Sequence, residues 1–128
     1  MISRGDARCG IAGFKVLHPL LYRVARAIEA FEGNLENNPG NLRKSSLARG
    51  GTTEFAVFDH YHIGFLALLF DLKAKAQGRT VTKLGPNSTI TDLMHAYAPP
   101  SENNTENYIR FIQVRTDLDP STRLGDLL

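Results

Sequence analysis

The chain has 128 residues, of which 42% are hydrophobic and 22% charged, which is enough for one soluble domain with a core but short for two. Its 15 basic and 13 acidic side chains give a net charge of +2, too balanced to predict a nucleic-acid partner. The single cysteine, Cys9, excludes an internal disulfide, and no Cys/His spacing indicates a zinc site, so neither metal nor cofactor is expected.

The start of the chain lacks the apolar run of a secretory signal, and residues 1–14, with three glycines and little periodicity, are predicted to form a loosely ordered arm. A first helix is expected from Pro19, a favoured first helical residue, to a C-cap at Gly33. Its apolar face is formed at spacings of three and four by Leu20, Leu21, Val24, Ala27, Ile28 and Phe31.

Glu32 lies in the last turn of this helix, at the edge of the apolar face. Partial burial and the helix dipole would both raise the pKa of its carboxyl group. A raised pKa is what a general acid needs near neutral pH. Glu32 as a surface residue beside a helix end is an equally good interpretation of the pattern.

Residues 34–54 have the composition of a loop. Asn34, Asn37, Asn38 and Asn41 are suited to turns and caps, or to presenting amide groups to the hydroxyl and N-acetyl groups of sugars. Thr52–Phe58 is a short strand candidate, expected to be one arm of a small hairpin.

A second helix is predicted at about 60–77, with Asp59 as its N-cap. It is apolar around nearly its whole circumference, which is typical of a buried central helix. Its longest apolar run, Ile63–Phe70, is far shorter than the roughly 20 residues that span a bilayer, so no membrane span is expected. His60 and His62 fall on different faces, which favours a role as first-turn residues over a catalytic one.

Two shorter helices follow. One is expected over Thr89–Ala98, ending at two prolines, and the next should begin at Asn103, with Glu106 three residues on as in a capping box. Leu118–Leu128 is predicted to pack as a final turn or to begin another element. The sum is one mainly α (α+β) domain over residues 1–128, with its core at about 15–118.

Five stretches together resemble a family. They are E-G at Glu32, N-N-P-G-N-L-R at Asn37–Arg43, F-A-V-F-D at Phe55–Asp59, G-F-L-A-L at Gly64–Leu68 and Y-A-P-P-S-E-N-N-T-E-N-Y at Tyr97–Tyr108. The series resembles small lysozyme-like proteins that are encoded mainly by phages and prophages. The resemblance covers about residues 20–118, and its most specific pieces are N-N-P-G-N and A-P-P-x-E-N-x-T-x-x-Y.

The resemblance implies a lysozyme-like fold related to goose-type lysozymes and lytic transglycosylases. It also implies cleavage of the β-1,4 bond between N-acetylmuramic acid and N-acetylglucosamine in peptidoglycan. Glu32 matches the catalytic glutamate at a helix end. The substrate-binding residues implied are Asn37, Asn38 and Asn41 in the cleft, and Tyr97, Glu102, Asn103 and Tyr108 on or behind the opposite wall.

The chain departs from the family pattern at two places. Tyr97 stands where the family often has Trp, and the loop between Gly33 and Asn37 is only Asn34-Leu35-Glu36. The short loop leaves the cleft more open or shifts the asparagines from Glu32, and it makes Glu36 a rival carboxylate.

One carboxylate suffices for a lytic transglycosylase, whereas a hydrolase usually needs a second. Glu54 and Asp59 are the candidates for a second, but no spacing places either, so the transglycosylase is slightly favoured. A catalytically inactive virion or wall-binding module and a pure interaction domain are the competing hypotheses. The expected partners are peptidoglycan strands and other virion proteins, and the expected location is a phage virion, or a host cytoplasm with delivery to the cell wall.

Overall fold

The computed structural model of the chain describes residues 2–33, 35–51 and 54–128. These residues form five α-helices, a two-stranded antiparallel sheet and a closing 3₁₀ turn, so the predicted mainly α class is confirmed. In chain order the elements are α1 Arg4–Leu17, α2 Pro19–Glu32, β1 Gly50–Gly51, β2 Ala56–Val57, α3 Tyr61–Ala76, α4 Ile90–Tyr97, α5 Thr105–Thr116 and η1 Leu124–Leu127.

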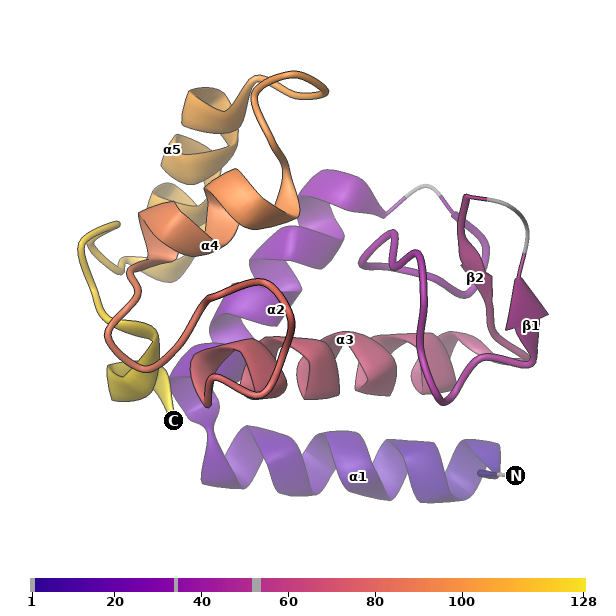
Figure 1. Cartoon of the computed structure of the whole chain (residues 1–128). Helices are drawn as coiled ribbons and strands as arrows, with labels where there is room; N and C mark the ends of the chain where they lie inside the picture. Colours follow the sequence, from indigo (N-terminus) through magenta and orange to yellow (C-terminus); the bar gives the residue numbers. More distant parts are fainter. Residues whose placement is uncertain (1, 34, 52–53) are drawn as a thin grey trace.

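Helix α3 is the centre of the molecule, as its uniform apolarity predicted. Its residues 63–69 are all buried, and it contacts α1, α2 and η1 (Figure 1). His60, and not Asp59 as predicted, is its N-cap residue. No helix in the described parts of the chain is long and apolar enough to cross a membrane.

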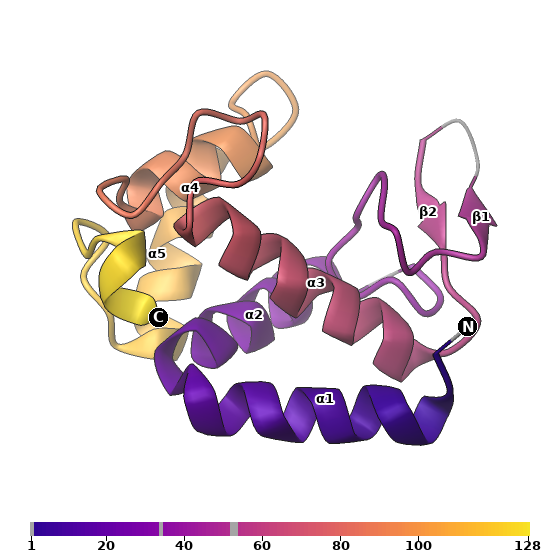
Figure 2. The same ribbon diagram turned by 60° about the horizontal axis from the view of Figure 1, so that its bottom comes forward.

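The prediction of a loosely ordered arm over residues 1–14 is wrong, because Arg4–Leu17 forms α1. Ser3 caps this helix by accepting a hydrogen bond from the amide of Asp6 at 3.0 Å. Ala7, Ile11 and Phe14 are buried at helical spacing, and the helix runs alongside α3 (Figure 2). Packing against α3 therefore outweighs the helix-weakening effect of the three glycines.

Helices α4 and α5 pack on one another, and α5 packs on α2 (Figure 1). Thr89 and Asp92 form a reciprocal capping box at the start of α4. The predicted cap of α5 is one residue out, because Asn104, not Asn103, accepts the hydrogen bond of the Asn107 amide at 3.1 Å.

The core extends beyond the predicted limit at residue 118. Leu124 and Leu127, in η1, are each 1% exposed. The segment that leads to them is held to the start of α4 by backbone bonds, among them Ile90 N–H to the Thr122 carbonyl at 3.0 Å. The C-terminal leucines therefore form part of the core as a final turn, which was one of the two predicted alternatives.

The strand predicted over Thr52–Phe58 is confirmed at Ala56–Val57. Gly50 pairs with Val57 and Gly51 with Ala56, which makes β1 and β2 a very short antiparallel pair. Thr52 and Thr53 lie outside the described residues. The pair is extended by a bond from the Ala56 amide to the Leu42 carbonyl at 2.9 Å, which ties it to residues 37–43, here called the asparagine loop.

The asparagine loop lies directly against α3. A Cβ atom added at Gly64 would stand 1.8 Å from the Asn37 carbonyl oxygen, and one added at Gly40 would stand 2.7 Å from Leu68. Both distances are shorter than any ordinary carbon contact. The loop approaches α3 this closely only because both positions are glycine.

We expect Gly64→Ala to lower the free energy of unfolding by about 2 kcal/mol or more, since the loop backbone must move away from α3. Gly13→Ala is the matched control, because it is also inside a helix but meets nothing within 4 Å. The control should stabilise by up to about 1 kcal/mol through helix propensity. Denaturant unfolding of both variants measures this, and a Gly64→Ala protein as stable as the wild type would contradict the close contact.

Candidate functional site

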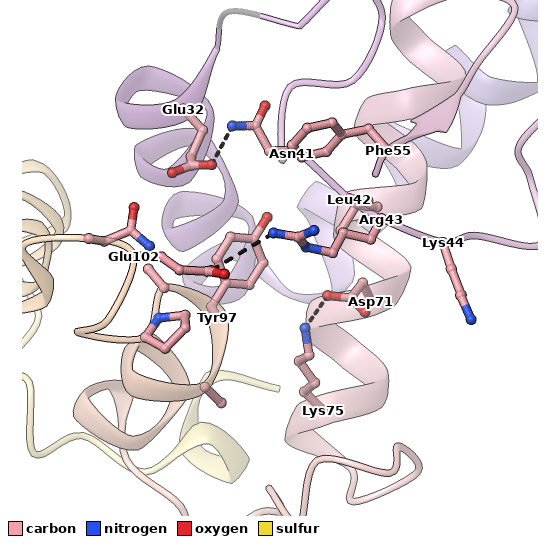
Figure 3. A pocket seen from close by; sticks show the side chains of 14 residues that line it. Glu32, Asn41, Leu42, Arg43, Lys44, Phe55, Asp71, Lys75, Tyr97 and Glu102 are labelled. Carbon is pink, nitrogen blue, oxygen red and sulfur yellow. Dashed lines mark hydrogen bonds and ion pairs between the residues drawn. The ribbon is translucent and has the colours of Figure 1, made fainter. Parts of the chain in front are cut away.

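Glu32 is the last residue of α2, and the chain turns sharply at Gly33. The amide of Gly33 caps the helix by bonding to the Glu29 carbonyl at 2.8 Å, and an added Cβ at Gly33 would stand 2.7 Å from that same oxygen. The turn therefore requires glycine. It leaves the Glu32 side chain half-buried and directed toward the asparagine loop (Figure 3).

Asn41 holds the Glu32 carboxylate. Its side-chain nitrogen donates a hydrogen bond to Glu32 Oε2 at 2.6 Å, and its backbone has φ of 51°, a left-handed conformation that asparagine tolerates well. With the nitrogen committed to Glu32, the Asn41 side-chain oxygen is buried and has no hydrogen-bond partner among the described residues.

Burial raises the pKa of Glu32 above its ordinary value of 4.5, against the opposing effects of the Asn41 hydrogen bond and of the nearby Tyr108 hydroxyl. This is the direction that the position at a helix end predicts. The proton on Glu32 is therefore held more firmly than on an exposed glutamate, while the two donors keep the ionised form accessible.

Tyr108, on α5, lies behind Glu32. Its side chain is fully buried and its ring stacks on Phe31, with centroids 3.8 Å apart. Its hydroxyl interacts with the Glu32 carboxylate but is outside good hydrogen-bond geometry to any described residue. Burial and then the charge of Glu32 raise the pKa of Tyr108 far above its usual value, so the hydroxyl keeps its proton. Tyr108 braces the site without lining it.

Glu32 and Asn41 open onto a cleft of about 560 Å³ between the asparagine loop and the α4–α5 connection (Figure 3). Five of the predicted site residues line it: Glu32, Asn41, Tyr97, Glu102 and Asn103. The size suits a ligand of a few sugar rings or a comparable small molecule.

The floor of the cleft carries Tyr97 and an ion pair on α3. Lys75 Nζ lies 2.6 Å from Asp71 Oδ2 and 4.9 Å from the centre of the Tyr97 ring. The Tyr97 hydroxyl donates to the Gly40 carbonyl, which joins α4 to the asparagine loop. Burial, Asp71 and Glu32 together raise the pKa of Tyr97 well above its usual value, so both carboxylates act on this hydroxyl.

A weak ion pair bridges the mouth of the cleft. Arg43 Nη2, from the asparagine loop, lies 3.8 Å from Glu102 Oε2, from the α4–α5 connection, and both side chains are more than half exposed. The Arg43 guanidinium also lies over the Phe55 ring at 5.4 Å. Exposed pairs of this kind contribute little to stability, so a ligand can separate them easily.

Asn37 and Asn38, predicted to bind substrate, are not among the residues that line the cleft. Asn38 is 1% exposed, and it bonds to the Leu42 amide and to the Leu42 and Ala56 carbonyls, at 2.9 to 3.1 Å. Asn37 has φ of 57° and donates to the carbonyls of Phe58 and Asp59. Both asparagines hold the loop in shape, which is the turn role that the sequence also allowed.

The carboxylates that the sequence offered as candidates for a second catalytic group do not line the cleft. Asp59 is paired with Arg49 at 3.3 Å, Glu36 is exposed on the loop before Asn37, and Glu54 is also absent from the lining. His60 and His62 are likewise outside it. Among the described residues, no group of three or more His, Cys, Asp or Glu is placed to hold a metal ion.

Sequence reasoning missed Asp71, Lys75 and Arg43 as cleft residues. Asp71 and Lys75 did carry a signal, because they are charges at i and i+4 where an otherwise apolar helix turns polar. Arg43 stood inside the N-N-P-G-N-L-R motif but had no partner at a recognisable spacing, since Glu102 is distant in the sequence.

No protein-family model matches the chain, and searches of curated proteins and of solved structures give no significant match. The function is therefore argued from the geometry of the cleft.

We expect Asn38→Ala to lower the free energy of unfolding by about 2–4 kcal/mol, because it leaves one amide and two carbonyl groups without their partner. Asn107→Ala, an exposed asparagine on α5, is the matched control and should change stability by less than about 0.5 kcal/mol. Denaturant unfolding distinguishes them. Equal stability of the two variants would rule out the bracing role of Asn38.

The pH dependence of stability should report the Glu32 environment. Because the pKa of Glu32 is higher in the native state than in the unfolded state, the native state binds more protons at pH values between the two pKa values. The stability that Glu32 contributes is therefore present at low pH and is lost as the pH rises through the native pKa. Glu32→Gln removes the titration and should be more stable than the wild type at neutral pH.

Denaturant unfolding at a series of pH values measures the difference in free energy of unfolding between Glu32→Gln and the wild type. This difference should shrink as the pH falls toward and below 4.5, where the carboxyl group is neutral in the native and the unfolded state. A difference that grows on acidification would mean that the pKa of Glu32 is lowered by folding.

Proposed function

We propose that this protein is a lysozyme-like enzyme that cleaves the β-1,4 bond between N-acetylmuramic acid and N-acetylglucosamine in peptidoglycan, as a lytic transglycosylase with Glu32 as its acid and base. The observation that carries the proposal is the half-buried Glu32 at the end of α2, with a raised pKa, held by Asn41 at the edge of a cleft. The resemblance of the motifs around Glu32, Asn37–Arg43 and Tyr97–Tyr108 supplies the substrate. It also supplies the phage or prophage setting.

In the first step the protonated Glu32 donates its proton to the glycosidic oxygen as the bond from that oxygen to the muramic C1 breaks. Positive charge develops on the sugar ring. The raised pKa supports this step because Glu32 keeps its proton to a higher pH than an exposed glutamate does. Asn41 and Tyr108 then stabilise the carboxylate that remains, since both interact with its ionised form.

In the second step the Glu32 carboxylate takes the proton of the muramic 6-hydroxyl, and the 6-oxygen bonds to C1. The product is a 1,6-anhydro sugar, and Glu32 regains the proton it lost. The unpaired side-chain oxygen of Asn41 is suited to accept from the N–H of an acetamido group, provided that the loop opens slightly on binding.

A hydrolase is the alternative, and the cleft offers two candidates for its second carboxylate: Asp71, which the sequence did not single out, and Glu102, which it assigned to substrate binding. Asp71 lies on the floor and Glu102 at the mouth. Asp71 is already paired with Lys75 at 2.6 Å and Glu102 with Arg43 at 3.8 Å. Asp71 is therefore not free to activate water without a rearrangement, which supports the single-carboxylate route, whereas a ligand can release Glu102 from its weak pair with Arg43.

The test is digestion of purified peptidoglycan by the wild type and by Glu32→Gln, with mass spectrometry of the released muropeptides. The wild type should release anhydro-muropeptides, and the variant should release them about 10²–10⁴-fold more slowly, the usual contribution of a general acid. Glu36→Gln is the matched control, since Glu36 is exposed outside the cleft lining, and it should act like the wild type.

Other products would change the assignment. Reducing ends in place of anhydro sugars would mean a hydrolase, and Asp71→Asn and Glu102→Gln would then identify the second carboxylate. Undiminished release by Glu32→Gln would show that another residue is the acid. A folded wild type that binds peptidoglycan without cleaving it would be an inactive wall-binding module.

A further inference from the structure

The cleft has a continuation that the proposed reaction does not use. A second groove of about 460 Å³ runs along the C-terminal half of α3, and it shares Leu42, Lys44 and Asp71 with the cleft. In Figure 3 the Lys44 side chain extends away from Glu32, beside α3. The cleft and the groove therefore adjoin at these three residues.

The groove is strongly cationic for a chain of nearly balanced charge. Lys44, Lys73 and Arg79 line it, and its one carboxylate, Asp71, is already paired with Lys75. Within the described residues none of the three cations forms an ion pair with a carboxylate, although the chain has 13 acidic side chains. Cations gathered in a groove and left without counter-charges produce a local field that attracts anions.

The remaining lining indicates an anion on an organic carrier. The side chains of Ser45 and Ser46 provide hydroxyl groups, and Phe70, whose side chain is 48% exposed, provides an apolar surface. Hydroxyl groups and ammonium or guanidinium groups are the usual partners of carboxylate and phosphate oxygens. An exposed aromatic ring beside them suits the aliphatic part of such a ligand.

We propose that this groove is an oxyanion-binding site for the acidic substituents of the polymer whose glycan lies in the cleft. The identity of the polymer rests on the proposed function. In peptidoglycan the anion is a carboxylate of a peptide stem attached to muramic acid. A phosphate of a polymer attached to the wall would present the same oxygen chemistry.

The experiment uses isothermal titration of the Glu32→Gln protein, so that ligands are not consumed. The ligands are a soluble glycan fragment with peptide stems, the same fragment with its stems removed, and inorganic phosphate. The stem-bearing fragment should bind about three- to tenfold more tightly than the stripped one, as expected for two or three exposed charge contacts. That advantage should decline with added salt.

The decisive variant adds Lys44→Gln and Arg79→Gln, both at exposed positions, so folding should be unaffected. Its matched control adds Lys83→Gln and Arg110→Gln, which remove the same charges at exposed positions outside both grooves. The first should lose the preference for stems, so that its affinity for the stem-bearing fragment falls to that for the stripped fragment, and the control should keep the preference. Equal binding of both fragments by the parent, or an unchanged preference in the first variant, would overturn the stem assignment.

The phosphate titration separates this inference from the proposed function. Suppose that neither glycan binds, but that phosphate binds and the Lys44→Gln, Arg79→Gln variant no longer binds it. The oxyanion site is then supported and the peptidoglycan assignment is overturned. If phosphate binds more tightly than the stem-bearing fragment, in a manner that depends on the same two residues, the source of the anion is a phosphate. If no anionic ligand depends on Lys44 and Arg79, the site does not exist.

Discussion

The close approach of the asparagine loop to α3 is the contact on which the cleft depends. The loop lies against α3 at Gly64, where an added Cβ would meet loop backbone, and at Gly40, where it would meet the Leu68 side chain, and it is joined to the sheet through Asn38. Asn41 reaches Glu32 only because the loop is held in this place. A substitution on the surface of α3 that moves the loop should therefore also move Asn41 away from Glu32, although Glu32 itself lies on α2.

The same contact sets the electrostatics of Glu32. Desolvation by the loop and by α5 favours the protonated form, while the donors on Asn41 and Tyr108 favour the ionised form. Desolvation is the larger effect, so the pKa rises, but the donors limit the rise. A group that both gives and takes a proton in one reaction needs this balance, since a carboxyl group buried without donors would hold its proton too firmly.

The sequence predicted elements where local pattern and packing agree, and failed where they conflict. The stripe of α2 and the uniform apolarity of α3 were sufficient to place both helices. Helix α1 was missed because three glycines concealed its buried face, which packs on a helix distant in sequence. Asn38 and Asn41 cannot be told apart by composition. Their roles depend on the backbone conformation that the loop adopts against α3. Only the structure therefore shows that Asn38 braces the loop and that Asn41 bonds to Glu32.

Charge around the C-terminal half of α3 forms two zones that the sequence presents as one polar end. At the Tyr97 end, Asp71 and Lys75 neutralise one another. Among the described residues that line the cleft, Glu32 is the carboxylate that bonds to an amide, whereas Asp71 and Glu102 pair with cations. Beyond Asp71 the lining turns cationic. A neutral sugar ring over the Asp71–Lys75 pair, with an acidic substituent over Lys44 and Arg79, would match this order. The separation also favours the protonated form of Glu32, because cations placed beside it would lower its pKa and leave less of the carboxyl group protonated.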